Sequence, residues 1–205
     1  MIKIQGKIPR KVGVAVSGGV DSMAALDFLR RNHDVRVYHY NHNTEYGQTA
    51  MSLVVDYCHK HNIPFVIEYL HKEKPRGKSW EEFWRDERYA FLNSQEDTIV
   101  LAHHLDDCVE TYAFNMCHGK EHTVPYRRAN CIRPFRLTRK QDLVEWGHTN
   151  KVQWLDDPTN LDPESKYMRA HIRSSVVPAM LKVNPGLHKV IYKKLKDEPL
   201  NIQDD

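Results

Sequence analysis

Two spacings of apolar residues alternate along the first hundred residues. Four short runs rich in Val, Ile and aromatic residues have the composition of buried strands: residues 12–16, 35–40, 65–69 and 98–102. Three segments between these runs carry helical spacing or a helix-capping signature: residues 21–31, 49–61 and 79–93. Strands that alternate with helices predict a parallel, doubly wound α/β sheet, with its ligand site at the carboxyl ends of the strands.

The pattern changes in the second half of the chain. We expect a short fifth strand at residues 131–133 and four helices: residues 106–118, 137–150, 168–183 and 187–196. Residues 119–130 are predicted to be a basic loop, and Pro178 is expected to kink or break the helix that contains it. The overall prediction is a mainly parallel five-stranded sheet in residues 1–135, with residues 136–205 as a small helical, basic extension of the same unit.

Composition narrows the class of protein. The 205 residues are 40% hydrophobic and 28% charged, which is typical of a soluble globular chain. No apolar run approaches the roughly 20 residues needed to span a bilayer, and the polar N-terminus is not a signal peptide. We therefore expect no membrane partner and a cytoplasmic location. The 4 cysteines form no Cys-x-x-Cys pair, so reduced thiols are expected.

Charge is distributed unevenly along the chain. Residues 120–196 contain 16 Lys or Arg against 7 Asp or Glu, whereas residues 1–119 contain 14 against 16. Within the basic half, residues 166–196 have eight basic residues and no acidic one. Such a one-sided charge favours binding to a phosphate backbone. The alternative is a solvated basic face without a partner.

The most informative motif is Ser-Gly-Gly-Val-Asp-Ser at residues 17–22, directly after the first apolar run. Its glycines let the backbone approach a ligand closely, and the amides at the start of the following helix favour an anion. A carboxylate beside bound phosphates needs a cation, so Asp21 predicts Mg²⁺. The motif lacks the Lys of a Walker A loop and differs from the Rossmann glycine fingerprint. An ordinary glycine-rich turn is the alternative.

A second motif follows the fourth apolar run. Residues 103–110 contain two histidines, two aspartates and a glutamate at a predicted strand-to-helix junction, where this fold places its ligand. Asp107 and Glu110 are three residues apart on the predicted helix and share a face, which suits recognition of a cationic amine. Acids that stabilise the start of a surface helix, or a divalent metal site, are the alternatives.

Two further segments place arginines on predicted helix faces. Arg85 and Arg88 lie at helical spacing, where they could make bidentate contacts to phosphate; salt bridges on a solvated face are the alternative. Arg169 and Arg173 are four residues apart and would face the same way.

Taken in order, these motifs closely resemble the N-terminal catalytic domain of the tRNA(Ile)-lysidine synthetases, which belong to the N-type ATP pyrophosphatase or PP-loop superfamily. The resemblance covers residues 12–186. Besides the glycine motif, it includes the Glu-x-x-x-Arg-x-x-Arg-Tyr helix, His-His-Leu-Asp-Asp-Cys-Val-Glu-Thr, Arg-Pro-Phe, Trp-Leu-Asp-Asp-Pro-Thr-Asn and the late Arg-x-x-x-Arg. It implies a Rossmann-like fold of the adenine nucleotide alpha hydrolase type.

In that family, ATP adenylates the wobble cytidine of an isoleucine tRNA with a CAU anticodon, and free L-lysine then displaces AMP to give lysidine. The resemblance therefore implies an ATP- and Mg²⁺-dependent ligase that releases AMP and pyrophosphate; a homodimer is left open. It implies catalytic roles for Asp21, Arg88 and His103. The implied ATP and pyrophosphate ligands are Ser17, Gly18, Gly19, Val20, Ser22 and His39. The implied lysine ligands are Asp107 and Glu110. The implied tRNA ligands are Arg127, Arg128, Arg133, Arg169 and Arg173.

The chain departs from the family pattern in three places. Residues 119–130 keep charge but only one glycine, Ala170 stands where the family has Asn, and the C-terminal domains that help many members bind tRNA are absent from the 205 residues. Three other functions stay open: a tRNA thiolase, a small-molecule amide ligase, and a nucleotide-binding protein without turnover.

Overall fold

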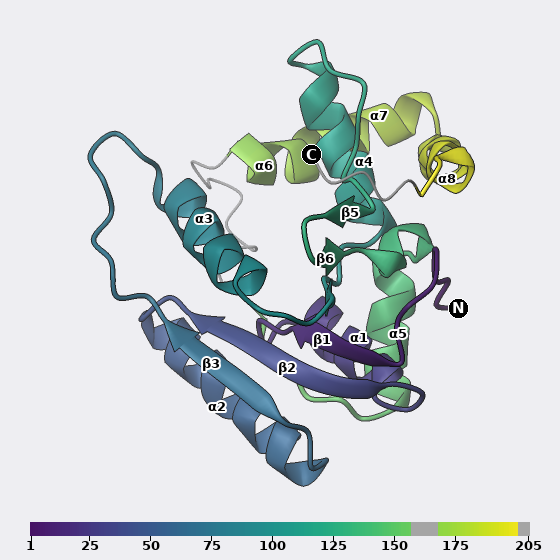
Figure 1. Ribbon diagram of the computed structural model, residues 1–205. Coiled ribbons are helices and arrows are strands. Elements are labelled where there is room, and N and C mark those ends of the chain that lie inside the picture. The colour runs from purple at the N-terminus through teal and green to yellow at the C-terminus, as the bar shows by residue number, and fades with distance from the viewer. Residues whose placement is uncertain (157–167, 201–205) are drawn as a thin grey trace.

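The computed structural model describes residues 1–156 and 168–200. Its centre is a six-stranded sheet in the order β3-β2-β1-β4-β6-β5 (Figure 1). The strands are β1 Lys11–Ala15, β2 Asp34–Asn41, β3 Phe65–Tyr69, β4 Ile99–Val100, β5 Arg127–Arg128 and β6 Cys131–Ile132. All neighbouring pairs are parallel except β5 with β6. The predicted parallel, doubly wound sheet is confirmed.

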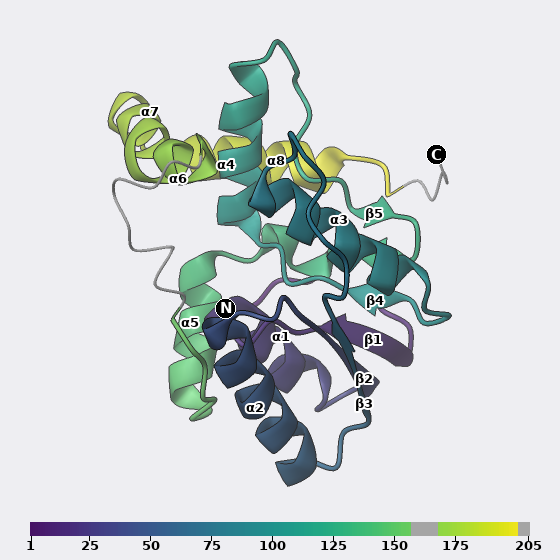
Figure 2. The ribbon, with the colours of Figure 1, turned by 90° about the vertical axis from the view of Figure 1, so that its left-hand side faces the viewer.

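Helices cover both faces of this sheet (Figure 2). They are α1 Val20–Leu29, α2 Glu45–Lys60, α3 Trp80–Asn93, α4 Leu105–Met116, α5 Lys140–Thr149, α6 Met168–His171, α7 Val177–Val183 and α8 Leu187–Asp197. The helices α1 and α2 lie on one face of the sheet and α3 on the other, while α5 packs against α1. The sheet is therefore buried on both faces, which explains its continuous Val-rich strands.

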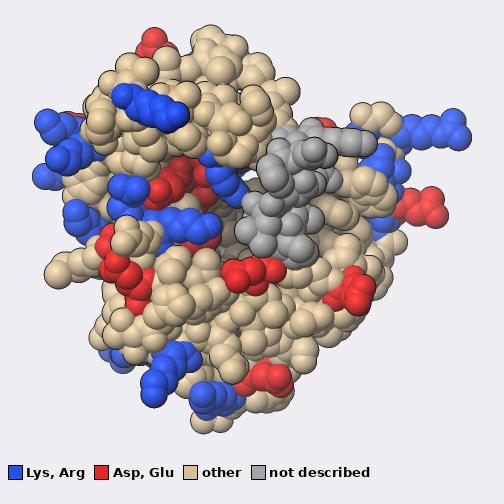
Figure 3. Space-filling view, turned by 180° about the vertical axis from the view of Figure 1, so that it is seen from behind, with Lys and Arg blue, Asp and Glu red and all other residues tan. Residues whose placement is uncertain are grey.

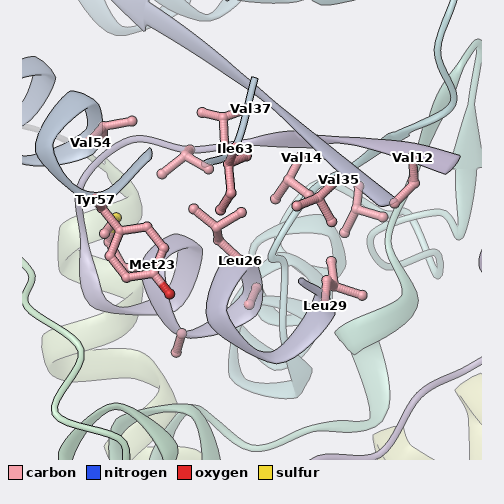
Figure 4. Close-up of a cluster of buried hydrophobic side chains, with 14 of the residues drawn as sticks. Val12, Val14, Met23, Leu26, Leu29, Val35, Val37, Val54, Tyr57 and Ile63 are labelled. Atoms are coloured by element: carbon pink, nitrogen blue, oxygen red, sulfur yellow. The ribbon is translucent and has the colours of Figure 1, made fainter. Parts of the chain in front are cut away.

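Three apolar clusters hold these layers together. Val14 and Val37 of the sheet pack against Leu26 of α1 and Val54 of α2 in the largest cluster (Figure 4). A second cluster joins α3 to the opposite face of the sheet. The third lies away from the long strands, where α8 packs against α4 through Leu195 and its neighbours. The C-terminal helices are thus attached to the sheet mainly through α4.

One detail differs from the sequence-based expectations. The segment predicted as a basic loop contains the short strand β5, which adds a sixth strand by antiparallel pairing. The helix expected over residues 168–183 is present as α6, the π-helical turn Ile172–Val176 and α7, so regular α-helical geometry is interrupted just before Pro178, as the proline predicts. Pro178 stands in the first turn of α7, where its missing N–H costs no hydrogen bond.

Among residues 1–156 and 168–200, no helix has the length and apolar character that a bilayer crossing requires.

Candidate active site

The order of the strands determines where the two main motifs meet. The chain runs from β1 outward through β2 and β3, then returns to the other side of β1 with β4. The carboxyl ends of β1 and β4 are neighbours, since Val14 pairs with Val100 in parallel register. In doubly wound sheets this reversal point is the usual ligand crevice. The glycine motif follows β1 and the His-His motif follows β4, so both open into that crevice.

The glycine loop is shaped by its backbone. Gly18 has φ +88°, in the left-handed region that favours glycine, and a Cβ there would lie 3.0 Å from the Cβ of Ala50. Ser22 Oγ donates to the carbonyl of Gly19 at 2.9 Å and accepts the amide of Ser17 at 3.1 Å. Gly19 begins α1 without a side-chain cap. In α2 and α3, the side chains of Thr44 and Ser79 accept hydrogen bonds from the first backbone amides. The amides at the start of α1 have no such side-chain acceptor, as an anion site requires.

A distant residue also supports the loop. The amide of Leu155 donates to the carbonyl of Gly18 at 3.0 Å. This contact brings the start of the Trp-Leu-Asp-Asp-Pro-Thr-Asn motif against the glycine loop. The last four residues of that motif, 157–160, lie outside the described residues.

Asp21 faces the crevice with an oxygen that lacks a hydrogen bond. Its buried Oδ1 has no hydrogen-bond partner among the described residues, although His104 Nε2 lies 3.5 Å away, and its Oδ2 lies 3.8 Å from Lys140 Nζ. Burial alone would raise the pKa of Asp21, but the contacts with His104, Lys140 and Arg173 lower it below its ordinary value. The carboxylate stays ionised and one oxygen is available to a cation.

His104 stands among three carboxylates. Its side chain is 4% exposed, and its ring nitrogens lie 3.5 Å from Asp21, 3.9 Å from Asp106 and 3.4 Å from Asp107. Burial lowers the pKa of His104, but Asp107 and the other carboxylates outweigh burial and raise the pKa to about 9. At neutral pH the ring is therefore held as an imidazolium, whose charge faces these acids.

The two acids expected to recognise an amine have different partners. Asp107 Oδ2 accepts the backbone amide of His104 at 2.9 Å, which closes the capping box of α4. Glu110 accepts two hydrogen bonds from Arg173, at 2.8 Å from Nε and 2.9 Å from Nη2. A residue predicted to bind lysine and one predicted to bind tRNA therefore form an ion pair with each other across the crevice.

His39, His103 and Arg88 are predicted site residues that have no carboxylate partner among the described residues. His39 Nδ1 donates to the carbonyl of Val16 at 2.8 Å, while its Nε2 and His103 Nδ1 are buried and have no hydrogen bond among the described residues. Burial lowers the pKa of both histidines, and for His103 the charges of Arg133 and Arg88 lower it further. No described residue forms an ion pair or side-chain hydrogen bond with Arg88, which lies 5.7 Å from the ring of Tyr89. Two neutral imidazoles and an uncompensated guanidinium suit a polar, anionic ligand.

Comparison with known proteins gives this crevice a family. Residues 2–180 match the model of the PP-loop domain. The chain belongs to the PP-loop family. Membership implies that the domain binds ATP, in agreement with the loop at residues 17–22.

Several curated relatives are named tRNA(Ile)-lysidine synthase. The tRNA(Ile)-lysidine synthase of Thermotoga maritima is 31% identical over 198 residues, covering 88% of this chain and 47% of the relative. The enzyme of the same name from Vibrio vulnificus is 28% identical and covers 88% of this chain and 45% of the relative. This chain thus spans about half the length of the curated relatives it matches. An NH3-dependent NAD synthetase from Campylobacter jejuni aligns with a TM-score of 0.51 at 9% identity, covering 97% of this chain and 92% of that one, and supports the fold alone.

The expected tRNA ligands are distributed unevenly around the PP-loop domain. Arg133 is only 3% exposed, because its guanidinium donates to the carbonyl of Pro125 and to the hydroxyl of Tyr89 at 3.1 Å each. It is a buried structural arginine, and we leave it out of any RNA surface. Arg128 is exposed and lies 5.9 Å from the ring of Tyr89, and Arg169 lies 6.0 Å from the ring of Phe114. Figure 3 shows basic side chains around a hollow that holds acidic ones, over the start of α4 and α5.

A large cavity lies apart from the PP-loop crevice. Its volume is about 790 Å³, and it is lined by residues that include Glu121, Arg128, Lys194 and Glu198. Of the predicted site residues only Arg128 lines it, so we do not assign the nucleotide to this cavity.

Sequence reasoning missed several residues of the crevice. Asp106 accepts hydrogen bonds from Arg139 at 3.2 Å and from the Lys140 amide at 2.8 Å, and its Oδ1 lies 3.1 Å from His188 Nε2. These contacts tie α4 to the start of α5 and to α8. The adjacent acids in the motif were visible in the sequence, but nothing in their spacing separates the aspartate that holds helices together from the one that faces the crevice.

Proposed function

We propose that this chain is an ATP-dependent tRNA-modifying ligase, which adenylates the wobble cytidine of tRNA(Ile) with a CAU anticodon and joins L-lysine to it. The observation that supports this proposal most directly is the meeting of a phosphate-binding loop with the acids of α4 at adjacent strand ends. The curated names of the relatives support the choice of substrate. Such a substrate places the enzyme in the cytoplasm.

The first step needs binding and charge neutralisation more than covalent help. The loop amides at residues 17–22 and the hydroxyls of Ser17 and Ser22 would hold the pyrophosphate end of ATP. Asp21, whose buried Oδ1 has no hydrogen-bond partner among the described residues and lies 3.5 Å from His104 Nε2, fits as the protein ligand of Mg²⁺, which commonly uses one or two carboxylates plus substrate phosphates. A bound Mg²⁺ would neutralise phosphate charge. Arg88 would stabilise the charge that develops on the α-phosphate while the cytosine carbonyl oxygen attacks it and pyrophosphate leaves.

The second step needs an amine held beside the adenylated base. Asp107 and Glu110 would bind the positively charged group of lysine, while the reacting amine loses its proton and attacks the activated ring carbon to expel AMP. Burial and the charges of Arg133 and Arg88 lower the pKa of His103 in the empty site, but bound phosphates would offset those charges, and we propose its Nδ1, which lacks a partner among the described residues, as the group that then accepts this proton. Because Glu110 is engaged by Arg173, this arginine must move or share the carboxylate when lysine binds.

A sulfur-transfer reaction is the weaker candidate. Cys58, Cys108 and Cys131 are buried, and burial raises the pKa of each thiol. Cys117 is exposed. A sulfur carrier needs an accessible thiolate. Three of the 4 cysteines therefore lack the environment for that reaction.

The test measures pyrophosphate release and transfer of radiolabelled lysine into a CAU-anticodon tRNA(Ile), each with and without ATP and Mg²⁺. We expect ATP-dependent incorporation of lysine, and none into the same tRNA with its wobble cytidine replaced by uridine. Pyrophosphate release without incorporated lysine would retain adenylation and reject lysine as the nucleophile. The absence of both pyrophosphate release and lysine incorporation would reject the proposed function.

A further inference from the structure

Four aromatic rings form a continuous series between the end of β2 and the start of α3. Tyr40 lies 5.1 Å from His42, His42 lies 5.4 Å from Trp84, and Trp84 lies 5.4 Å from Trp80, measured between ring centroids. The last two pairs are tilted by only 37° and 38°. Because β2 is the direct neighbour of β1, the series begins beside the PP-loop crevice.

The outer end of this series is open to solvent. Trp80 is 47% exposed, and it is one of only a few large apolar side chains in the described part of the chain with such exposure. A tryptophan usually buries its ring, since burial of this large apolar surface stabilises the fold. Trp80 packs against Trp84 and Phe83, and its exposed part could stack a further flat ring if the flexible Lys74 side chain above it moves aside.

The segment that precedes Trp80 is basic, although the exposed Glu81 and Glu82 follow it. The segment between β3 and α3 contains Lys72, Lys74, Arg76 and Lys78 against Glu73 alone. Lys74 Nζ lies 5.5 Å from the centroid of the Trp80 ring. Lys72 and Lys78 are neutralised by Glu87 and Asp86, but Arg76 forms no ion pair with any described residue. Lys74 has no carboxylate partner among the described residues, although its Nζ donates to the carbonyls of Pro75 and Lys78. An aromatic ring beside cations that lack an acidic partner combines base stacking with phosphate attraction, which is how proteins bind single-stranded nucleic acids.

The inner rings are suited to support such stacking. Burial, with the nearby charge of Arg88, lowers the pKa of His42 to about 4, so its ring is neutral at physiological pH. Trp84 is held between His42 and Trp80 on the first turns of α3. The series is therefore anchored on a strand end and a helix rather than on a loop, and the Trp80 face is positioned before any ligand arrives.

We propose that Trp80 stacks an unpaired RNA base that lies next to the base being modified, with Lys74 and Arg76 contacting the adjoining phosphates. This inference rests on the proposed function for the identity of the RNA, and it adds a recognition element that the catalytic residues do not supply. The adenine of ATP is the competing occupant, because it too is a flat ring. Two rings separate Trp80 from Tyr40 at the end of β2, which favours the longer RNA chain over a single nucleotide held at the PP-loop.

The experiment compares Trp80→Ala and Trp80→Phe with the wild-type chain. Binding of a fluorescently labelled tRNA(Ile) anticodon stem-loop is measured by anisotropy, and binding of ATP is measured separately by equilibrium dialysis. Val190→Ala, on α8 and 52% exposed in the wild type, is the control for loss of a surface apolar group. We expect Trp80→Ala to weaken RNA binding about tenfold, Trp80→Phe to restore it to within about twofold, and ATP binding to stay unchanged in both.

Several outcomes would overturn the proposal. The proposal fails if RNA affinity is unchanged in Trp80→Ala or is reduced equally in Val190→Ala. It also fails if the wild-type chain does not bind the RNA. Weaker ATP binding with unchanged RNA binding would assign the ring to adenine instead. Lysine transfer, measured in parallel, separates the two hypotheses. If the wild-type chain binds the stem-loop through Trp80 but transfers no lysine, the stacking site is retained and the proposed ligase function is rejected. If lysine transfer and RNA binding are both unaffected by Trp80→Ala, the ligase function is retained and the stacking site is rejected.

Discussion

The glycine loop and the C-terminal helices contribute to the same crevice by different physical means. The loop is fixed by its backbone: a left-handed glycine, an inward-facing serine and the hydrogen bond from Leu155. The segment with α6 and the π-helical turn packs on α4 through apolar side chains such as Ile172 and adds the ion pair of Arg173 with Glu110. On the proposed function, a rigid loop would carry the nucleotide chemistry, and side chains that can exchange partners would bind the acceptor. Changes in the loop should abolish turnover, and changes in the C-terminal segment should alter substrate affinity.

The largest effect is expected from Gly18→Ala. The new Cβ would lie 3.0 Å from the buried Ala50, at a φ of +88° that costs a non-glycine residue about 1–2 kcal/mol. The loop must therefore shift, and we expect pyrophosphate release to fall by about 100-fold or more because the phosphate donors lose their alignment. Gly19→Ala is the matched control: at φ −78° its Cβ meets only Ser17 Oγ at 3.7 Å. Equal unfolding midpoints for the two variants would contradict the assigned strain.

The second prediction concerns the pH dependence of stability. The pKa of His104 is raised from 6.5 to about 9, so its contribution is fully present below pH 6.5 and is lost as pH rises towards 9. The free energy of unfolding of the wild type, relative to His104→Asn, should fall by about 1.4 kcal/mol per pH unit in that interval, to a total of about 3 kcal/mol at most. Urea unfolding at pH 6, 7, 8 and 9, without ATP or Mg²⁺, measures this difference. A difference independent of pH would show that the three carboxylates do not hold a proton on His104.

The third prediction separates the two roles of Glu110. Glu110→Gln should raise the KM for lysine about tenfold, because a charged hydrogen bond is replaced by a neutral one. The KM for ATP should stay within about twofold of the wild type. Arg173→Met, which removes the competing cation from Glu110, should lower the KM for lysine while raising the KM for tRNA. Lysine titrations of the transfer reaction at saturating ATP distinguish these effects; a raised ATP KM in Glu110→Gln would place this acid in the nucleotide site.

The smallest effect is expected on the outer surface. Arg128→Met and Arg169→Met each remove one exposed cation without breaking an ion pair among the described residues. Each should weaken tRNA binding several-fold and reduce its salt dependence by about one counterion, whereas lysine and ATP constants should not change. Binding measured from 50 to 200 mM salt provides the slopes. Unchanged slopes in both variants would remove these arginines from the proposed RNA surface.

Much of the fold could be predicted because its signals are local. The Val-rich runs, the capping signature at Ser79 and the glycine loop each depend on neighbours a few residues away, and the parallel sheet that they predict is confirmed. The short strand β5 was missed because two residues carry no periodicity, and its pairing with β6 is decided by a tight turn. The change of helix type before Pro178 does have a local signal, the proline itself.

The contacts of the crevice were harder to predict because they join distant parts of the chain. The pairing of Glu110 with Arg173 and the hydrogen bond from Leu155 to Gly18 depend on the folded path. Adjacent residues can also have opposite fates. His103 is held neutral, whereas His104 is held charged, and only their neighbours in space distinguish them. The burial of Arg133 is of the same kind, since its partners are a carbonyl and a tyrosine hydroxyl that sequence spacing does not reveal.

We propose that the PP-loop and its neighbours activate the RNA, whereas Asp107 and Glu110 bind the amine. The most direct test is a single-turnover assay of Asp107→Asn with tRNA(Ile) and ATP, in which pyrophosphate release and lysine incorporation are followed in the same reaction. The account predicts pyrophosphate release at a rate within a few-fold of the wild type, with lysine incorporation reduced at least about tenfold. Parallel loss of both signals would contradict it, because Asp107 would then belong to the machinery of the first step.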